Sequence, residues 1–377
     1  MAGLYVHIPF CQRKCPYCDF YSLAGAEQLI PEYVYSLVGH LRQWALCENL
    51  DEPFASVFFG GGTPSLLEAE QVGTVLEEAS RLFGLRPEAE ITIEANPGTL
   101  SLEKLRGYRS AGINRLSLGV QSFHKENLSF LERIHGPEEI AQSVFWARQA
   151  GFDNLGLDLM FGLPGQTPGK FLEDMQQAVA LAPRHLSLYG LTVEEGTPFA
   201  CRQEDGQPLA AGEEEWRAMF LGADEFLCQR GFRHYEISNY ASPGWECRHN
   251  LAYWRRHPYL GIGAGAHSFL ARGFGERWAA PNDLKVFFSR LEKGENPADF
   301  VEDFSREQAM GETLYLGLRT APGVSEADFQ NRFGSGVAAA FPEALRFLGK
   351  KVYRHQGCWR MTLEGWSIYD HLIQEFF

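Results

Sequence analysis

The sequence predicts an α/β fold built on a parallel β-sheet of about six βα units, followed by a small α+β module. Through the first half of the chain, short continuous apolar runs alternate with helical patterns. Such runs are typical of parallel strands that are buried on both faces. From about Val301 the pattern changes to a long helix and then short strands, which indicates a separate module.

The predicted elements follow one another in a regular order. The strands are Leu4–Ile8, Ala55–Phe59, Glu90–Ala95, Arg115–Val120, Asn154–Met160 and His185–Leu191. The helices between them are Pro31–Leu46, Glu68–Phe83, Ser101–Ala111, Pro137–Gly151 and Lys170–Leu181. Further on we expect a helix over Glu213–Arg230, a strand over His234–Tyr240, a helix over Ser305–Leu318 and strands within Lys351–Thr362. These patterns predict a sheet core over 1–200, an extension over 201–300 and a C-terminal module over 301–377.

The charge of the chain restricts its partners. Its 377 residues carry a formal net charge of -14, which repels phosphate backbones, so we expect no nucleic-acid partner. No apolar run approaches the roughly 18 residues that span a bilayer. No basic segment followed by an apolar stretch opens the sequence, as it would in a signal peptide. We therefore expect a cytoplasmic protein.

Three of the eight cysteines lie within one short segment after the first strand. Cys11, Cys15 and Cys18 have the spacing C-x3-C-x2-C, and three thiolates so placed can hold an iron–sulfur cluster with one iron left open. A zinc site with His7 or a distant cysteine as fourth ligand is an alternative, although no second C-x2-C pair is present. Three reduced, buried cysteines are a further alternative, which the polar residues between them disfavour.

Polar residues and glycines follow the ends of successive predicted strands. The carboxyl ends of parallel strands form one rim, where active sites lie in barrels of this kind. The cysteine segment opens on the same rim, so we expect a lined cavity there. The residues concerned are Gly60–Pro64, Glu94, Gln121, Asp158 and Tyr189.

The cysteine motif resembles that of the radical S-adenosylmethionine (SAM) superfamily. The further motifs resemble its oxygen-independent coproporphyrinogen III oxidase-like branch and, within that branch, the HemW group of heme chaperones. The resemblance covers nearly the whole chain and implies a partial (β/α) barrel with a HemN-like C-terminal module. It also implies a [4Fe-4S] cluster on Cys11, Cys15 and Cys18, with cluster loop 9–20, whose open iron binds SAM.

The resemblance further implies a SAM pocket. The stretch Gly60–Pro64 matches the GGGTP motif of the family, in which glycines let the backbone approach the methionyl group. Carboxylates suit ribose hydroxyls, and an arginine suits the methionyl carboxylate. By this match the binding residues are Tyr5, Tyr17, Gly61, Gly62, Thr63, Glu94, Gln121, Arg133 and Asp158.

A basic and aromatic segment, residues 247–257, matches the HNxxYW signature that is associated with heme in HemW proteins. The matching residues are His249, Asn250, Tyr253 and Trp254. A histidine can ligate heme iron and aromatic rings can stack on a porphyrin. The neighbouring arginines can pair with propionates. The alternative is a solvated basic loop with aromatic anchors.

The resemblance therefore implies a heme chaperone that delivers heme to acceptor hemoproteins, with respiratory, membrane-associated proteins as candidate acceptors, and that needs an electron donor for its cluster. The alternative is oxygen-independent coproporphyrinogen III oxidase, a radical SAM decarboxylase. That enzyme carries a fourth cysteine where this chain has Phe20, and an N-terminal extension where this chain's first strand already begins. Radical modification of RNA is a third possibility, which the acidic charge disfavours.

Overall fold

The computed structural model describes residues 2–48 and 52–376, and its core is one twelve-stranded sheet. Seven neighbouring strands run parallel, in the order β11-β1-β4-β5-β6-β7-β8. Their bounds are β1 Ala2–Ile8, β4 Phe54–Gly61, β5 Leu85–Ala95, β6 Arg115–Gln121, β7 Asn154–Phe161, β8 His185–Gly190 and β11 Tyr259–Ile262. The six strands predicted from the first half of the chain are all present, and β11 adds a seventh.

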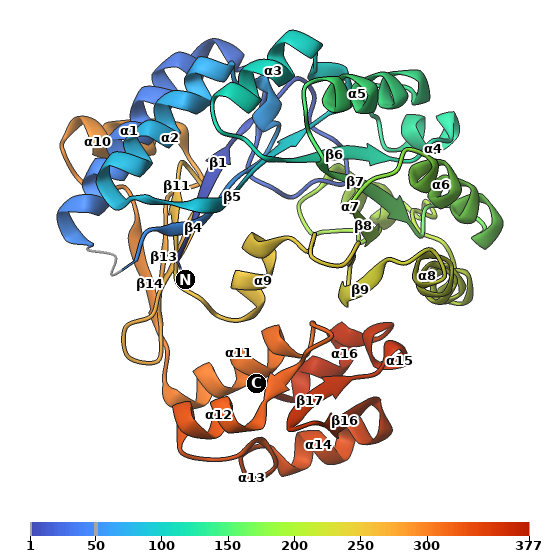
Figure 1. The fold of residues 1–377 in the computed structure, drawn as a ribbon. Coiled ribbons are helices and arrows are strands. Elements are labelled where there is room, and N and C mark those ends of the chain that lie inside the picture. The colour runs from blue at the N-terminus through green and yellow to red at the C-terminus, as the bar shows by residue number, and fades with distance from the viewer. Residues whose placement is uncertain (1, 49–51, 377) are drawn as a thin grey trace.

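Helices cover the outer face of the curved sheet (Figure 1). They follow the strands as in a βα barrel, and their amphipathic sequences bury one side against the sheet. The covering helices are α1 Ile30–Cys47, α2 Ala69–Phe83, α3 Leu102–Ser110, α4 Lys125–Phe130, α5 Pro137–Gln149, α6 Pro168–Ala180 and α8 Glu213–Cys228. The short helix α7, Pro198–Glu204, follows β8.

Antiparallel strands extend the sheet at both edges and leave the barrel open. On one side lie β12 His267–Leu270, β13 Glu276–Ala279 and β14 Asp299–Asp303, with helix α10 Leu284–Glu292 in the connection between the last two. On the other side β8 pairs with β10 Asn239–Ala241, which pairs with β9 Arg233–Glu236. The prediction of one strand over His234–Tyr240 is wrong, because the Glu236 carboxylate accepts hydrogen bonds from Ser238 and Asn239 and closes a tight turn.

Helix α9, Arg248–Trp254, lies on the inner side of the sheet, at the open side of the barrel (Figure 1). It is formed by the basic and aromatic segment. The Glu90 carboxylate of β5 accepts hydrogen bonds from the backbone N–H groups of Arg248 at 2.9 Å and His249 at 3.2 Å. The first turn of a helix leaves such N–H groups without partners, so Glu90 fixes the start of α9 to the sheet.

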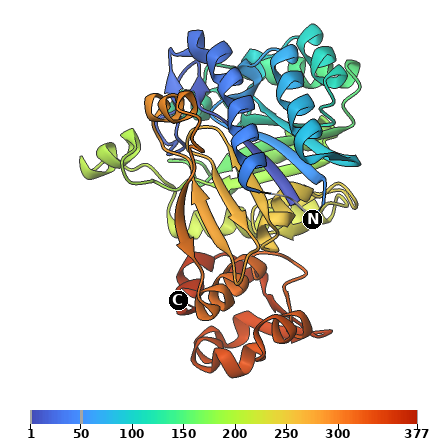
Figure 2. The same ribbon diagram turned by 90° about the vertical axis from the view of Figure 1, so that its left-hand side faces the viewer.

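The C-terminal residues form a separate layer next to the barrel (Figures 1 and 2). A three-stranded sheet of β15 Val324–Ser325, β16 Val352–His355 and β17 Cys358–Met361 packs with helices, as the α+β prediction requires. The helices are α11 Arg306–Gly317, α12 Glu326–Phe333, α13 Val337–Ala340, α14 Pro342–Leu348, α15 Leu363–Trp366 and α16 Tyr369–Ile373. The predicted unit boundaries near residues 200 and 300 stay predictions, and the outer ends at 1 and 377 lie outside the described residues. No helix in the described ranges is both long and apolar enough to cross a membrane.

Candidate functional site: a two-lobed cavity at the barrel rim

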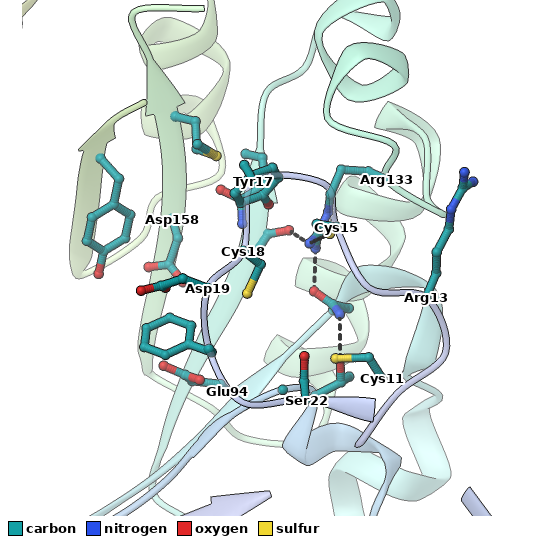
Figure 3. A pocket seen from close by; sticks show the side chains of 18 of the residues that line it. Cys11, Arg13, Cys15, Tyr17, Cys18, Asp19, Ser22, Glu94, Arg133 and Asp158 are labelled. Carbon is teal, nitrogen blue, oxygen red and sulfur yellow. Dashed lines mark hydrogen bonds between the residues drawn. The ribbon is translucent and has the colours of Figure 1, made fainter. Parts of the chain in front are cut away.

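The three clustered cysteines lie on one loop after β1, and the loop curves around a cavity of about 420 Å³ (Figure 3). Short strands β2, Phe10–Cys11, and β3, Leu23–Ala24, pair in parallel and close the base of this loop. All three thiols are free and line the cavity. Burial raises the pKa of the Cys11 thiol, and it raises that of Cys18 to about 11. Burial therefore destabilises the thiolate form of both cysteines, and a bound metal cation would stabilise that form by accepting the sulfurs as ligands.

The glycine stretch at the end of β4 holds the base of the cysteine loop. The N–H of Gly62 donates to the Ile8 carbonyl at 2.9 Å, and that of Thr63 donates to the Phe10 carbonyl at 2.8 Å. A Cβ on Gly62 would lie 3.0 Å from the Cys11 sulfur and under 3.0 Å from both carbonyl oxygens. Glycine is therefore needed here for the cysteine loop to approach β4 closely.

The arrangement of the thiols suits a cluster better than a single ion. No three His, Cys, Asp or Glu side chains in the described part of the chain come close enough together to hold one metal ion. The three sulfurs are instead distributed along the loop at the cavity wall. An iron–sulfur cube, which takes a thiolate on each of several irons, fits separated sulfurs, whereas zinc requires a tight tetrahedron.

A buried guanidinium next to the cysteines provides a site for an anion. Arg133 donates to the Cys15 sulfur at 3.5 Å, to the Gly119 carbonyl at 3.0 Å and to the Asn96 side chain. Its Nε is buried and has no hydrogen-bond partner. No carboxylate of the described residues pairs with it, so a bound carboxylate would supply the missing negative charge. The methionyl group of SAM carries such a carboxylate.

Two partly buried carboxylates form the opposite wall of the cavity (Figure 3). Glu94 is the penultimate residue of β5, and Asp158 lies on β7, where it accepts a hydrogen bond from Ser117 at 3.2 Å. Burial, with Asp158 nearby, raises the pKa of Glu94 to about 8, and burial also raises the pKa of Asp158. Carboxyl groups without cationic hydrogen-bond partners suit ribose hydroxyls, which both donate and accept.

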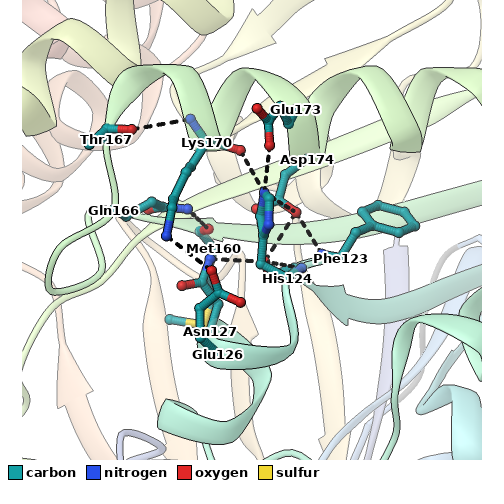
Figure 4. Close-up of polar contacts among 11 residues, drawn as sticks. Phe123, His124, Glu126, Asn127, Met160, Gln166, Thr167, Lys170, Glu173 and Asp174 are labelled. Carbon is teal, nitrogen blue, oxygen red and sulfur yellow. Dashed lines mark hydrogen bonds and ion pairs between the residues drawn. The ribbon is translucent and has the colours of Figure 1, made fainter.

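Gln121 reaches the cavity from a strained turn at the end of β6. Its φ of 67° is in the left-handed region, which costs energy for a residue with a side chain. The carboxylate of Asp174 on α6 accepts hydrogen bonds from the Ser122 hydroxyl at 2.8 Å and the Phe123 N–H at 2.6 Å (Figure 4). These bonds hold the turn and so fix the place of Gln121.

A second lobe of about 520 Å³ adjoins the first, and both are lined by Asp19, Phe20, Glu94, Ser117, Asp158 and Tyr189. Asn250 and Tyr253 of α9 line it from the open side of the barrel. Tyr5 lines the second lobe too, but it does not line the first. Trp254 lies outside both lobes, with the Arg319 guanidinium 4.5 Å from the centre of its ring.

His249 also borders the second lobe, but its ring is only 1% exposed. Nδ1 is 2.8 Å from the Ser56 hydroxyl and Nε2 is 2.9 Å from the Tyr253 hydroxyl. The ring also stacks on Phe58 with centroids 5.1 Å apart. Burial, with Arg115 nearby, lowers the pKa of His249 to about 3, so the imidazole is neutral.

Comparison with known proteins places this chain in a family. The pattern of the radical SAM superfamily matches residues 5–178, and that of the HemN C-terminal domain matches 304–368. The heme chaperone HemW of Bacillus subtilis is 34% identical over 358 residues, which are 94% of this chain and 93% of that protein. HemW of Haemophilus influenzae is 43% identical over 73% of this chain and 72% of its own length. The chain belongs to the HemW family.

Among solved structures, coproporphyrinogen III oxidase (HemN) from Escherichia coli, described as a radical SAM enzyme, superposes with a TM-score of 0.85. The match covers 100% of this chain and 89% of HemN at 23% identity, and it confirms the fold, a partial radical SAM barrel with a C-terminal module. Membership of the HemW family brings with it the [4Fe-4S] cluster and SAM. The residues that hold them here stay predictions.

The structure brings most of the predicted site residues together and adds others. Residues of the first lobe include Tyr17, Gly62, Thr63, Gln121 and Arg133, while Tyr5 and Gly61 line only the second. Asn96 was not predicted, although it connects Thr63 to Arg133. It follows Glu94 by two residues, so the strand-end argument would have found it. His267 and Asn282 also line the second lobe, and no sequence pattern indicates them.

Proposed function

We propose that this chain is a heme chaperone, which binds heme together with a [4Fe-4S] cluster and SAM and delivers the heme to acceptor hemoproteins. The observation that carries the proposal is its similarity to HemW proteins over almost their full length. Because the chain is acidic, we expect no nucleic-acid partner. We also propose that it works in the cytoplasm. The acceptor is a respiratory, membrane-associated hemoprotein, and a separate electron donor reduces the cluster.

The first lobe holds the cluster and SAM in this proposal. Cys11, Cys15 and Cys18 ligate the cluster, which supplies an open iron for SAM and an electron for its cleavage. Arg133 receives the methionyl carboxylate, because its buried Nε has no partner among the described residues. The ribose and the remainder of SAM are bound by Tyr5, Tyr17, Gly61, Gly62, Thr63, Glu94, Gln121 and Asp158.

The second lobe holds the heme. Its volume of about 520 Å³ falls within the range of ligand pockets, and it opens towards solvent at the rim of the barrel. The signature segment supplies one wall, in which Asn250 and Tyr253 face the lobe and His249 supports Tyr253 from behind. Trp254 anchors the end of α9 against Arg319. Because the two lobes share a wall, heme and SAM would occupy adjoining space.

An anaerobic heme titration of the cluster-loaded protein, followed by the Soret band, tests this function. We expect saturation near one heme per chain and transfer of that heme to an added apo-hemoprotein such as apomyoglobin. Asn250→Trp should block uptake by filling the second lobe. Arg255→Trp is the matched control, since Arg255 is exposed and does not line the lobe. Absence of specific uptake by the unaltered protein would refute the chaperone function.

Oxidative decarboxylation of coproporphyrinogen III is the second candidate, because the fold is that of HemN. Phe20 stands where that enzyme has its fourth cysteine. It is 59% exposed at the boundary of the two lobes. Protoporphyrinogen IX formation under strict anaerobiosis, with a reductant and SAM, would establish the enzyme. Heme uptake without product formation would exclude it.

A further inference from the structure

Three histidines line the second lobe: His7, His249 and His267. Each is a possible axial ligand for heme iron, since a neutral imidazole binds iron through a ring nitrogen that has a free lone pair. A nitrogen that is held in a buried hydrogen bond must give up that bond first, which leaves its former partner unsatisfied. The hydrogen bonds of the three rings therefore discriminate between them.

Two of the three rings are already committed to the protein. His249 uses both nitrogens for Ser56 and Tyr253, as described above. His7 is 4% exposed, with Nδ1 3.0 Å from the Tyr5 hydroxyl and Nε2 2.8 Å from the Tyr21 carbonyl. Neither ring can turn an unoccupied nitrogen towards the lobe without breaking the packing that surrounds it.

His267 is different in each respect. It is the first residue of β12, which runs antiparallel to β11, so it lies at the rim where the parallel strands end. Its side chain is exposed. Within the described residues it has no side-chain hydrogen bond, ion pair or ring contact. Partial burial and the nearby Arg277 lower the pKa of His267, which favours the neutral, metal-binding form.

An exposed aromatic side chain lines the same lobe as His267. Phe20, on the cysteine loop, is 59% exposed and lines both lobes. An exposed phenyl ring at the mouth of a cavity is typical of a surface that a flat apolar ligand covers. Histidine and phenylalanine thus provide a nitrogen ligand and an apolar contact in one lobe, as a porphyrin requires.

We propose that His267 is the axial ligand that holds heme iron at the mouth of the second lobe, with the porphyrin ring against Phe20. This inference rests on the proposed function, and it assigns the ligand to a residue outside the HNxxYW signature. His249 then has a positioning role, since it connects β4 to Tyr253 on α9 and shapes the wall of the lobe. The heme thereby stays accessible for transfer to an acceptor.

The test compares four cluster-loaded proteins: the unaltered chain, His267→Ala, His249→Gln and His355→Ala. Glutamine keeps a donor and an acceptor in the buried site, and His355 is an exposed histidine on β16, which makes it the matched control. The readouts are the Soret band in anaerobic titration and the electron paramagnetic resonance spectrum of the ferric heme. Circular dichroism and iron content verify that each variant is folded and loaded.

We expect His267→Ala to lose the spectrum of histidine-ligated heme and to bind heme at least about tenfold more weakly, as for loss of a metal ligand. Added imidazole should restore the spectrum, while His249→Gln and His355→Ala should keep it. An unchanged spectrum and affinity in His267→Ala would overturn the assignment, and loss in His249→Gln alone would move the ligand to His249. Absence of heme uptake by the unaltered chain would instead overturn the proposed function, and this inference with it.

Discussion

Gly62 offers the sharpest test of how the cysteine loop is held. In Gly62→Ala the new Cβ would lie 2.8 Å from the Phe10 oxygen, 2.9 Å from the Ile8 oxygen and 3.0 Å from the Cys11 sulfur. Ordinary non-bonded contacts are about 3.5 Å or more, so the loop must retreat by roughly half an ångström. Overpacking of this kind costs about 1–3 kcal/mol, and here it displaces a ligand. We expect the cluster to be held about tenfold more weakly.

The assay is anaerobic reconstitution, followed by measurement of iron and sulfide per chain and of the rate at which a chelator removes the cluster. Gly222→Ala is the matched control. Gly222 lies within α8, where no atom other than its chain neighbours and the backbone of its own helix comes within 4 Å of the added Cβ, and neither glycine has a positive φ. Alanine should stabilise that helix by about 0.5–1 kcal/mol. Full iron content and an unchanged rate of loss in Gly62→Ala would refute the steric reasoning.

Three further substitutions test the first lobe. Cys15→Ala should abolish the visible absorption of the cluster, and a complete [4Fe-4S] spectrum would exclude Cys15 as a ligand. Arg133→Lys should weaken SAM binding about tenfold at equal cluster content, because an ammonium cannot replace several directed guanidinium hydrogen bonds. Calorimetry measures the affinity, and an unchanged value would exclude Arg133 from the SAM site. Glu94→Gln should flatten the pH dependence of stability. Since the pKa of Glu94 rises from 4.5 to about 8 on folding, the folded chain without SAM retains a proton that the unfolded chain releases. The free energy of unfolding should therefore fall as the pH rises between these values, and equal slopes in both proteins, measured by denaturant unfolding, would contradict this reasoning.

The bounds of the parallel strands could be predicted closely because buried strands leave a recognisable pattern of apolar residues in the sequence. Arg115–Val120 was predicted and β6 is Arg115–Gln121, since both faces of the strand are covered and all but two of its residues are buried. The strand-end argument also succeeded for Glu94, Gln121 and Asp158, which all line the first lobe. Here the topology alone determines the position, and the topology follows from repeated βα units.

The second lobe could not be predicted in the same way. Its wall is helix α9, whose place inside the barrel depends on contacts with Ser56 and Glu90, each more than 150 residues away in the sequence. Trp254 belongs to the same signature but points elsewhere, because adjacent helical residues face different sides. His267 belongs to no sequence motif, and only its lack of a side-chain partner within residues 2–48 and 52–376 distinguishes it.

The buried residues that hold the start of α9 show why the HNxxYW signature can have a structural role and still belong to a binding site. Glu90 is 6% exposed and Arg115 is 2% exposed, and they lie close enough for their charges to interact. Glu90 accepts from the first N–H groups of α9, so the charge of a buried carboxylate is offset by Arg115 and by the positive end of the helix. His249 extends the same attachment to β4 through Ser56. His249, whose ring nitrogens are both hydrogen-bonded, therefore sets the shape of the lobe. A residue that binds and releases heme iron needs a ring nitrogen without a hydrogen-bond partner, as His267 has among the described residues.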